Sequence, residues 1–158
     1  MNTPLFYGKR VYDVSGFPDR IIKYFGTDIT SAKAQNELRL HQIGADLGIS
    51  PKIHDTNINQ VPQPAPEDYY IIMDRVNGLT VADYYGDDIP VKVWNEIRRL
   101  LQLLFDNGVE YIDISPYNFM VDSATEKIYV IDYGHAREIN WFLREFLEGA
   151  KAWNPDFT

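Results

Sequence analysis

Three residues in the last third of the chain have side chains that could do chemistry on a polar ligand. Asp113 is followed five residues later by Asn118, and Asp132 comes after a further apolar stretch. A carboxylate can accept a proton from an attacking group, and carboxylate and amide oxygens are the ligands that Mg²⁺ prefers. The set therefore predicts a proton acceptor beside a metal site. The simpler alternative is that Asp113 and Asn118 only shape a turn, and that Asp132 ends an ordinary hairpin.

A hairpin is expected to bring these residues together. Apolar runs at 119–121 and 127–131 predict two short strands, and the polar stretch 122–126 between them predicts a turn. Asn118 would then stand directly before the first strand, and Asp132 directly after the second. A carboxylate at the end of an apolar strand can face a cleft without being carried into the core, so its position suits a metal ligand.

Two helices are predicted on either side of this hairpin. The helix at 90–107 has an amphipathic pattern and ends at Gly108, which can adopt the backbone conformation of a helix C-terminal cap. A last helix is predicted at 138–150. The apolar face of the first is expected to contain Trp94, Ile97, Leu101, Leu104 and Phe105, and that of the second Trp141, Phe142, Phe146 and Ala150.

The first half of the chain predicts a small antiparallel sheet with one helix. Residues 10–14 and 20–25 are rich in β-branched and aromatic side chains, and the turn-forming stretch 15–19 separates them. Residues 31–47 predict a helix that begins at Thr30 or Ser31 and ends near Gly48. Two more strands are predicted at 52–54 and 69–74, across the connection 57–68.

The order of Asp113, Asn118 and the triplet Asp132-Tyr133-Gly134 resembles the protein-kinase catalytic loop followed by the Asp-Phe-Gly motif. The resemblance implies that Asp113 accepts the proton of the attacking hydroxyl, and that Asn118 and Asp132 hold Mg²⁺. Lys23 on the second strand resembles the kinase lysine that binds the ATP phosphates. Glu37 in the next helix resembles its ion-pair partner.

The same resemblance implies a site for the adenine of ATP. Residues 71–78 resemble the segment that links the two lobes of a kinase and offers backbone groups to the base. Taken singly, each apolar residue concerned is more often plain core, so the residues count only as a set. By this resemblance, Met73 lies behind the adenine, 74–76 (Asp74 and Val76 included) form the hinge, Met120 is the floor, and Val11 and Ile21 are the roof.

The fold class implied is α+β, in a minimal bilobal protein-kinase-like arrangement that makes up a single domain. A small lobe at about 1–73 would contain the antiparallel sheet and one helix. A hinge at about 74–78 would lead into a reduced, mainly helical large lobe at about 79–158. The length of 158 residues supports one compact core rather than several.

Several positions depart from the usual kinase pattern. Ser115 stands where typical protein kinases have a lysine, which makes the loop more similar to the atypical RIO kinases and the kinase of the KEOPS complex. Tyr111 and Ile112 replace the usual His and Arg, and only a remnant of the glycine-rich loop is found at 8–12. Since no activation segment is recognised after Gly134, we expect constitutive assembly or control by a regulatory protein partner.

Three functions are compatible with these residues. The resemblance to the atypical kinases favours a serine/threonine protein kinase that uses ATP and Mg²⁺ and acts on a protein substrate. Aminoglycoside and choline kinases share the counterparts of Asp113, Asn118 and Asp132, so a small-molecule kinase is the second possibility. The third is an inactive nucleotide-binding pseudokinase that works as an interaction module.

Composition limits the partners that are expected. Fifteen Lys and Arg against 23 Asp and Glu give a formal charge of −8, which argues against broad binding to nucleic acid or an anionic membrane. There is no cysteine, hence no disulfide framework. No run approaches the roughly 18 apolar residues of a membrane span, and the first residues lack the pattern of a signal peptide. A cytoplasmic protein is therefore expected.

Overall fold

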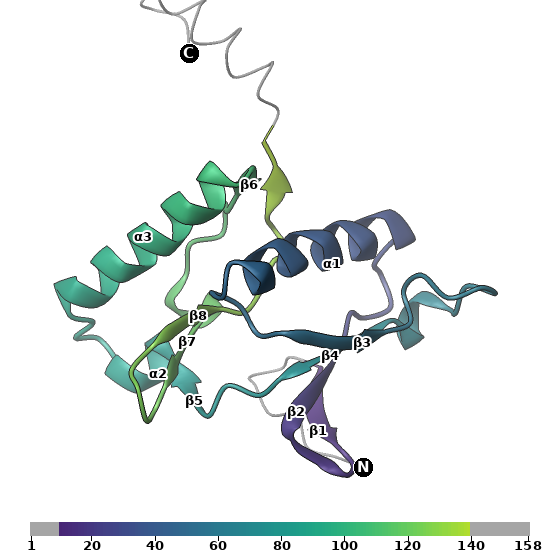
Figure 1. Ribbon diagram of the computed structural model, residues 1–158, viewed down its shortest axis with the longest axis horizontal. Coiled ribbons are helices and arrows are strands. Elements are labelled where there is room, and N and C mark those ends of the chain that lie inside the picture. Colours follow the sequence, from purple (N-terminus) through teal and green to yellow (C-terminus); the bar gives the residue numbers. More distant parts are fainter. Residues whose placement is uncertain (1–9, 140–158) are drawn as a thin grey trace, which may run out of the picture.

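The computed structural model describes residues 10–139 of the chain and has a mixed α+β architecture (Figure 1). This confirms the predicted fold class. The first half contains β1 (Val11–Val14), β2 (Phe17–Tyr24), α1 (Ser31–Asp46), β3 (Ile53–Thr56) and β4 (Tyr70–Asp74). The second contains β5 (Gly78–Thr80), α2 (Val81–Tyr85), α3 (Val91–Asp106), β6 (Val109–Glu110), β7 (Phe119–Asp122), β8 (Ile128–Val130) and β9 (Arg137–Glu138).

The first four strands form one antiparallel sheet in the order β1-β2-β4-β3. The predicted first hairpin is confirmed, but its turn is shorter than expected because Phe17 already pairs with Val14. Lys23 pairs with Val11 on one side and with Ile71 on the other. Strand β2 lies between β1 and β4, so the backbone at Lys23 has a neighbouring strand on both sides.

Helix α1 begins and ends where its sequence predicts. The Thr30 side chain accepts a hydrogen bond of 3.2 Å from the Lys33 N–H, which satisfies one of the free donors at the helix start. At the other end, Gly48 has a φ of +75°, a conformation that glycine adopts without strain. The face of α1 toward the protein contains Ala34, Glu37, Leu40, His41 and Gly44.

A second sheet, β5-β7-β8, carries the hairpin that was predicted around residues 119–131. Strand β5 and helix α2 were not predicted. Gly78 explains why β5 can pair here: a Cβ at this position would lie 1.7 Å from the carbonyl oxygen of Val121. Only glycine allows the backbone to come so close.

Helix α3 is confirmed, but its predicted buried face was partly wrong. The fully buried side chains are Val93, Ile97, Leu100 and Leu104. Trp94, Leu101 and Phe105 are only half-buried. The apolar stripe of α3 is broad. The centre of this stripe packs against the core, whereas the sequence prediction had chosen one edge of it.

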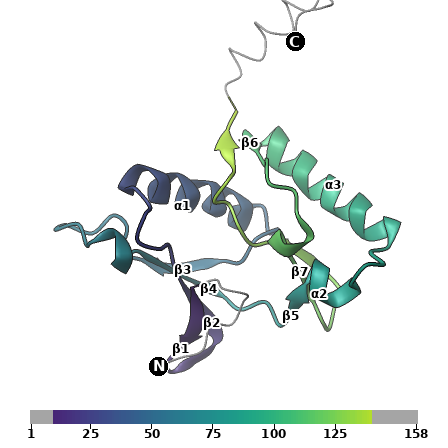
Figure 2. The ribbon, with the colours of Figure 1, turned by 180° about the vertical axis from the view of Figure 1, so that it is seen from behind.

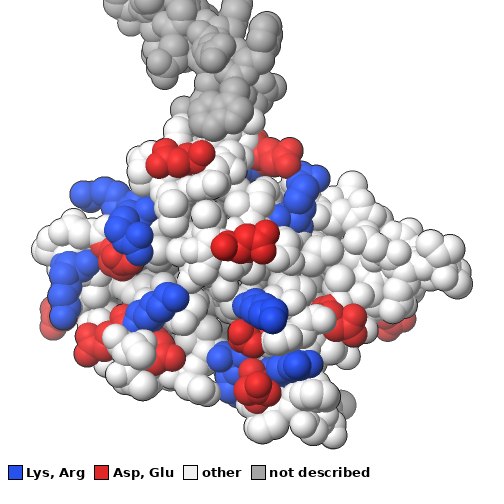
Figure 3. Space-filling model, viewed as in Figure 1, with Lys and Arg blue, Asp and Glu red and all other residues white. Residues whose placement is uncertain are grey.

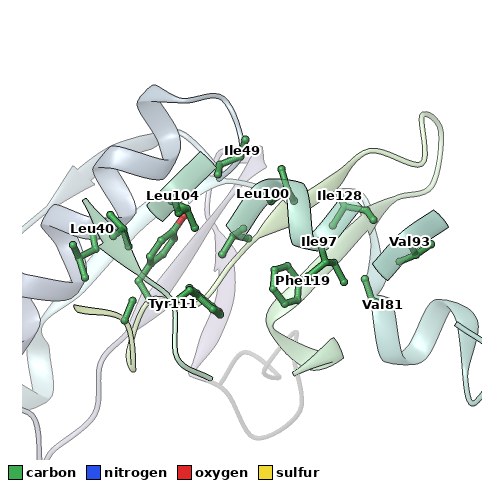
Figure 4. Packing of buried hydrophobic residues seen from close by; sticks show 14 of the residues in the cluster. Leu40, Ile49, Val81, Val93, Ile97, Leu100, Leu104, Tyr111, Phe119 and Ile128 are labelled. Carbon is green, nitrogen blue, oxygen red and sulfur yellow. The ribbon is translucent and has the colours of Figure 1, made fainter. Parts of the chain in front are cut away.

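Buried apolar side chains form two clusters. The smaller belongs to the first sheet and the start of α1, and includes Val11, Ile21, Ala34 and Met73. The larger gathers around α3, β7 and β8, yet it also takes in Leu40 of α1 and Ile49 just after it (Figure 4). Helix α1 therefore packs against both clusters. The predicted boundaries of the two lobes stay a prediction.

The predicted helix at 138–150 does not begin where expected. Arg137 and Glu138 form strand β9, which pairs with β6, and Ile139 donates a backbone hydrogen bond of 2.9 Å to Gly108. The rest of that predicted helix lies outside the described residues. None of the described helices has the length and apolar character needed to span a bilayer.

Two views from opposite sides show the arrangement that matters for the site. In both, the chain from β6 to β7 passes between α1 and α3 (Figures 1 and 2). This connection contains Asp113 and Asn118. On the face seen in Figure 3, the Lys and Arg side chains of the described residues are interspersed with Asp and Glu.

Candidate active site

Lys23, Glu37 and Asp132 come together from three distant parts of the chain. Lys23 Nζ lies 3.0 Å from Glu37 Oε2 and 3.8 Å from Asp132 Oδ1. Burial by itself would lower the pKa of Lys23, but the charges of Glu37 and Asp132 outweigh it and raise the pKa. The lysine is therefore held as a cation beside two carboxylates.

Asp113 and Asn118 are linked by the loop that joins β6 to β7. Asn118 is the last residue of a single 3₁₀ turn, Pro116–Asn118. The side chain of Ser115 caps the start of this turn. The Asn118 amide Nδ2 donates to the Asp113 backbone carbonyl at 2.9 Å and to its carboxylate Oδ2 at 3.3 Å. Asn118 is buried, whereas Asp113 is exposed to solvent. The carboxylate can thus meet an incoming molecule.

Asn118 and Asp132 are brought near each other by the β7-β8 hairpin. Phe119 pairs with Val130 across the hairpin, and Ile131 donates a backbone hydrogen bond of 3.1 Å to the Asn118 carbonyl. Asp132 Oδ1 accepts a hydrogen bond of 2.9 Å from the Gly134 N–H, which orients the carboxylate. The expected neighbourhood of these two residues is therefore found.

The oxygen donors present fit a magnesium ion that is shared with a ligand. Asn118 uses Nδ2 to bind Asp113, and no hydrogen bond to its Oδ1 is found among the described residues. No group of three or more His, Asp or Glu able to hold a metal is found in the same part of the chain. Proteins usually bind Mg²⁺ with one or two side chains plus phosphate oxygens and water. Asn118 and Asp132 are a donor set of that kind.

An apolar cavity of about 230 Å³ opens beside Lys23 and Asp132. Its lining contains eight residues predicted from the sequence, and neither Glu37, Asp113 nor Asn118 is among the lining residues. Those eight are Val11, Ile21, Lys23, Met73, Asp74, Val76, Met120 and Asp132. Sequence reasoning missed Pro51, Thr80, Tyr117 and Ile131. Tyr117 and Ile131 adjoin predicted site residues, so adjacency in sequence could have indicated them; Thr80 belongs to the unpredicted β5.

The segment 74–76, which the sequence predicts as a hinge, is hydrogen-bonded to β2 and to the residue before β3. The Asp74 N–H donates to the Lys52 carbonyl at 2.9 Å, and the Arg75 N–H donates to the Asp19 carbonyl at 2.8 Å. The Asp74 carboxylate also binds His54. Among the described residues no hydrogen bond from the Val76 N–H is found. Val76 is one of the residues that line the cavity.

No protein-family model and no curated protein matches the chain. Its structure is similar to the kinase PK-1 of Cydia pomonella granulovirus, with a TM-score of 0.61 and 19% identity over 82% of this chain and 48% of that one. The fold is kinase-like. It is also similar to the bifunctional kinase-methyltransferase WbdD, with a TM-score of 0.56 and 20% identity over 85% of this chain and 33% of WbdD. For a co-crystal structure of WbdD with the kinase inhibitor LY294002, the TM-score is 0.51 and the identity is 19%, over 85% of this chain and 34% of that chain.

The chain thus spans about half or less of the length of these three structures. At these identities the likeness concerns the fold alone. The closer similarity to RIO and KEOPS kinases stays a prediction, as do the roles of the individual site residues.

Beneath the site, this kinase-like fold contains buried polar side chains that sequence reasoning did not assign. His41 Nε2 donates to the Pro51 carbonyl at 2.8 Å, and its ring stacks on Tyr133. The Tyr111 hydroxyl donates to the Asp132 carbonyl. Burial raises the pKa of both Tyr111 and Tyr133, so both hydroxyls remain protonated.

His41 should make the stability of the fold depend on pH. Burial, with a smaller contribution from the charge of Lys23, lowers the pKa of His41 from 6.5 to about 4. Between these values the unfolded chain binds a proton that the folded chain does not. The free energy of unfolding should therefore fall as pH drops from about 6.5 to 4, by up to about 3 kcal/mol.

Denaturant unfolding across this pH range checks the expectation, with His41→Gln as the comparison. All other titrating groups are common to both proteins, so the difference between the two curves isolates His41. The glutamine variant should lose part of the slope below pH 6.5. Parallel curves would contradict the assignment.

Proposed function

We propose that the chain is an ATP- and Mg²⁺-dependent phosphotransferase that transfers the γ-phosphate to a hydroxyl group. The observation that carries this proposal is Lys23, held between Glu37 and Asp132 at the edge of an apolar cavity. An apolar cavity suits a nucleobase, and a fixed cation at its edge suits the attached phosphates. The kinase-like fold supports the same reaction class.

Each residue then has a definite task. The adenine would lie between the roof of Val11 and Ile21 and the floor of Met120, with the Val76 N–H as a hydrogen-bond donor. Lys23 would bind phosphate oxygens. Asn118 and Asp132 would hold Mg²⁺, which neutralises phosphate charge when bound.

Asp113 would orient the acceptor hydroxyl and accept its proton. Because this carboxylate is exposed, a hydroxyl on the surface of another protein can reach it. We therefore propose a serine or threonine of a protein as the acceptor. A regulatory protein partner and a cytoplasmic location complete the proposal.

The deciding experiment is incubation with γ-labelled ATP, Mg²⁺ and a cell extract, followed by separation of protein-bound from small-molecule label. Label on protein, at serine or threonine by mass spectrometry and lost when Mg²⁺ is chelated, is expected. Label only on small molecules would favour a small-molecule kinase. Nucleotide binding without any transfer would show a pseudokinase.

Removing the Lys23 charge should weaken nucleotide binding. Lys23→Met is expected to raise the Kd for Mg·ATP by about ten- to a hundredfold, because a charge-assisted bond to phosphate is lost. The same change leaves the buried Glu37 without its cation, so stability should fall as well. Calorimetric titration and denaturant unfolding measure the two effects separately.

The double variant Lys23→Met/Glu37→Gln separates the two causes. It removes the uncompensated buried charge and should regain stability, while ATP affinity should remain low. Recovery of affinity in the double variant would show that Lys23 supports the fold rather than the phosphates.

A further inference from the structure

Three exposed apolar side chains lie within a few residues of one another in the loop that carries Asp113. Ile112 is 52% exposed, Ile114 is 55% exposed and Tyr117 is 56% exposed. Isoleucine is among the residue types most often buried, and a single exposed one needs no explanation, whereas a group of exposed apolar residues indicates a contact surface. We refer to Ile112, Ile114 and Tyr117 as the apolar patch.

The backbone arranges two members of this patch around Asp113. The Ile114 N–H donates a hydrogen bond of 3.1 Å to the Ile112 carbonyl, which closes a three-residue turn with Asp113 at its apex. Asp113 is exposed there, and an exposed isoleucine stands on each side of it in the chain. A molecule that reaches the Asp113 carboxylate therefore approaches beside these two isoleucines.

The turn is anchored at both ends, so the exposure of its isoleucines is a property of the folded chain. Before the turn, Tyr111 is 9% exposed, and its hydroxyl donates to the Asp132 carbonyl. After the turn, the buried Asn118 donates to the Asp113 backbone carbonyl at 2.9 Å. Neither isoleucine belongs to the two apolar clusters formed by the described residues.

Tyr117 connects the patch to the cavity beside Lys23. It lines this cavity together with Lys23 and Asp132, although more than half of its surface is exposed. Asn118, the next residue in the chain, binds the Asp113 carboxylate at 3.3 Å. The apolar patch thus extends from the proposed nucleotide site to the proposed base, which is where an acceptor must lie during transfer.

The chemistry of the patch favours one class of acceptor. Residues 111–118 contain a single charged side chain, Asp113, and no Lys or Arg. A sugar or an aminoglycoside carries hydroxyl or amino groups close to the reacting hydroxyl, and isoleucine side chains cannot form hydrogen bonds with them. Apolar side chains next to the acceptor would instead be removed from water together with the patch, which is favourable.

We propose that the acceptor is a serine or threonine with apolar residues beside it in its protein, and that Ile112 and Ile114 select it. In the transfer step, the hydroxyl oxygen forms a bond to the γ-phosphorus and the bond from this phosphorus to the β,γ-bridging oxygen breaks. ADP leaves, and the hydroxyl proton passes to Asp113. Ile112 and Ile114 determine specificity and take no part in the chemistry. This inference rests on the proposed phosphotransferase function and adds the sequence context of its substrate.

Competing peptides test the preference. Three otherwise identical peptides carry leucine, lysine or glutamate on both sides of one central serine. Two at a time compete for the parent chain with labelled ATP and Mg²⁺, and mass spectrometry measures each product. We expect kcat/KM for the leucine peptide to exceed that for either charged peptide by at least about tenfold. Equal values, or preference for a charged peptide, would refute the proposal.

Ile112→Lys and Ile114→Lys should change the preference. Both positions are exposed, so the fold should tolerate the substitutions. The ratio of kcat/KM for the leucine peptide to that for the glutamate peptide should fall by at least about tenfold, because apolar contact is lost and opposite charges meet. This ratio does not depend on the amount of active chain, since both peptides compete for the same molecules. A ratio that is unchanged in both variants would overturn the proposal.

Val91→Lys is the matched control. Val91 is 74% exposed at the start of α3, so the variant adds the same charge outside the loop and the cavity. The control should keep the ratio of the parent. A shift as large as that of Ile114→Lys would attribute the effect to net charge and refute a local contact.

A second copy of this chain is the other occupant to test. Sedimentation velocity of the parent and of Ile114→Lys gives the oligomeric state. We expect the same state for both proteins. A parent dimer that Ile114→Lys dissociates would assign the patch to self-association and refute the proposal.

Peptides with alanine in place of the serine distinguish failure of this inference from failure of the proposed function. They cannot accept phosphate, and fluorescence anisotropy measures their Kd in the presence of Mg·ATP. A parent chain that transfers phosphate to no peptide and no protein refutes the phosphotransferase. Binding alone then decides on the patch. Tighter binding of the leucine peptide that is lost in Ile112→Lys and Ile114→Lys supports it, and equal binding of all three peptides refutes it.

Discussion

Asp113→Ala should lower the rate of phosphate transfer by several orders of magnitude, while the affinity for Mg·ATP stays within about tenfold of the parent value. Proton acceptance and alignment of the hydroxyl act in the transition state, so their loss affects the reaction and not the binding of the nucleotide. Asn118 should remain in place, because its Nδ2 also donates to the backbone carbonyl of residue 113. That bond survives the substitution.

Single-turnover transfer of labelled phosphate and calorimetric titration of Mg·ATP measure the two quantities. Asp88→Ala, at an exposed position outside the site, is the control for loss of a carboxylate. Stability should change little in either variant, since Asp113 is exposed and keeps few contacts. A variant of Asp113 that transfers phosphate at the parent rate would show that another group is the base.

Asp132→Asn should reduce Mg²⁺-dependent turnover by at least about a thousandfold, because the charged metal ligand is lost. The fold should survive, since an asparagine Oδ1 can still accept the hydrogen bond that Gly134 donates to Asp132. Lys23 would keep its shorter contact, to Glu37 at 3.0 Å. The effect should therefore concentrate on the metal.

Turnover measured over a range of Mg²⁺ concentrations, together with thermal unfolding, checks this expectation. Asp88→Asn serves as the control for the same chemical change elsewhere. Equal magnesium dependence in the variant and the parent would remove Asp132 from the metal site.

The pairing of Lys23 with Glu37 was implied by the resemblance to the kinase small lobe, in which a strand lysine is followed by a helix glutamate, and the observed contact of 3.0 Å agrees with it. The hairpin around 119–131 was clear from the residues themselves, since two apolar runs flank a polar turn. It brings Asn118 next to the strand that ends before Asp132.

Other features depend on contacts that no local pattern reveals. Strand β5 has three residues and owes its place to the close approach of Gly78 to Val121, which only the folded chain creates. The buried hydrogen bond between the Tyr133 hydroxyl and Ser50 Oγ joins positions far apart in the chain, and both residue types are common in cores and turns. The buried side of α3 was misjudged because its apolar stripe is wider than the surface it covers.

Helix α1, which contributes to both apolar clusters, has a consequence for how the chain folds. Leu40 and Ile49 bury their side chains only when α3 and the β7-β8 hairpin are present. The first half of the chain on its own would leave these side chains in water, so it lacks part of its stabilising burial until the second half is made. During synthesis α1 therefore reaches its full burial only after residues near 130 have been made, and the two halves should gain and lose their structure in one cooperative transition.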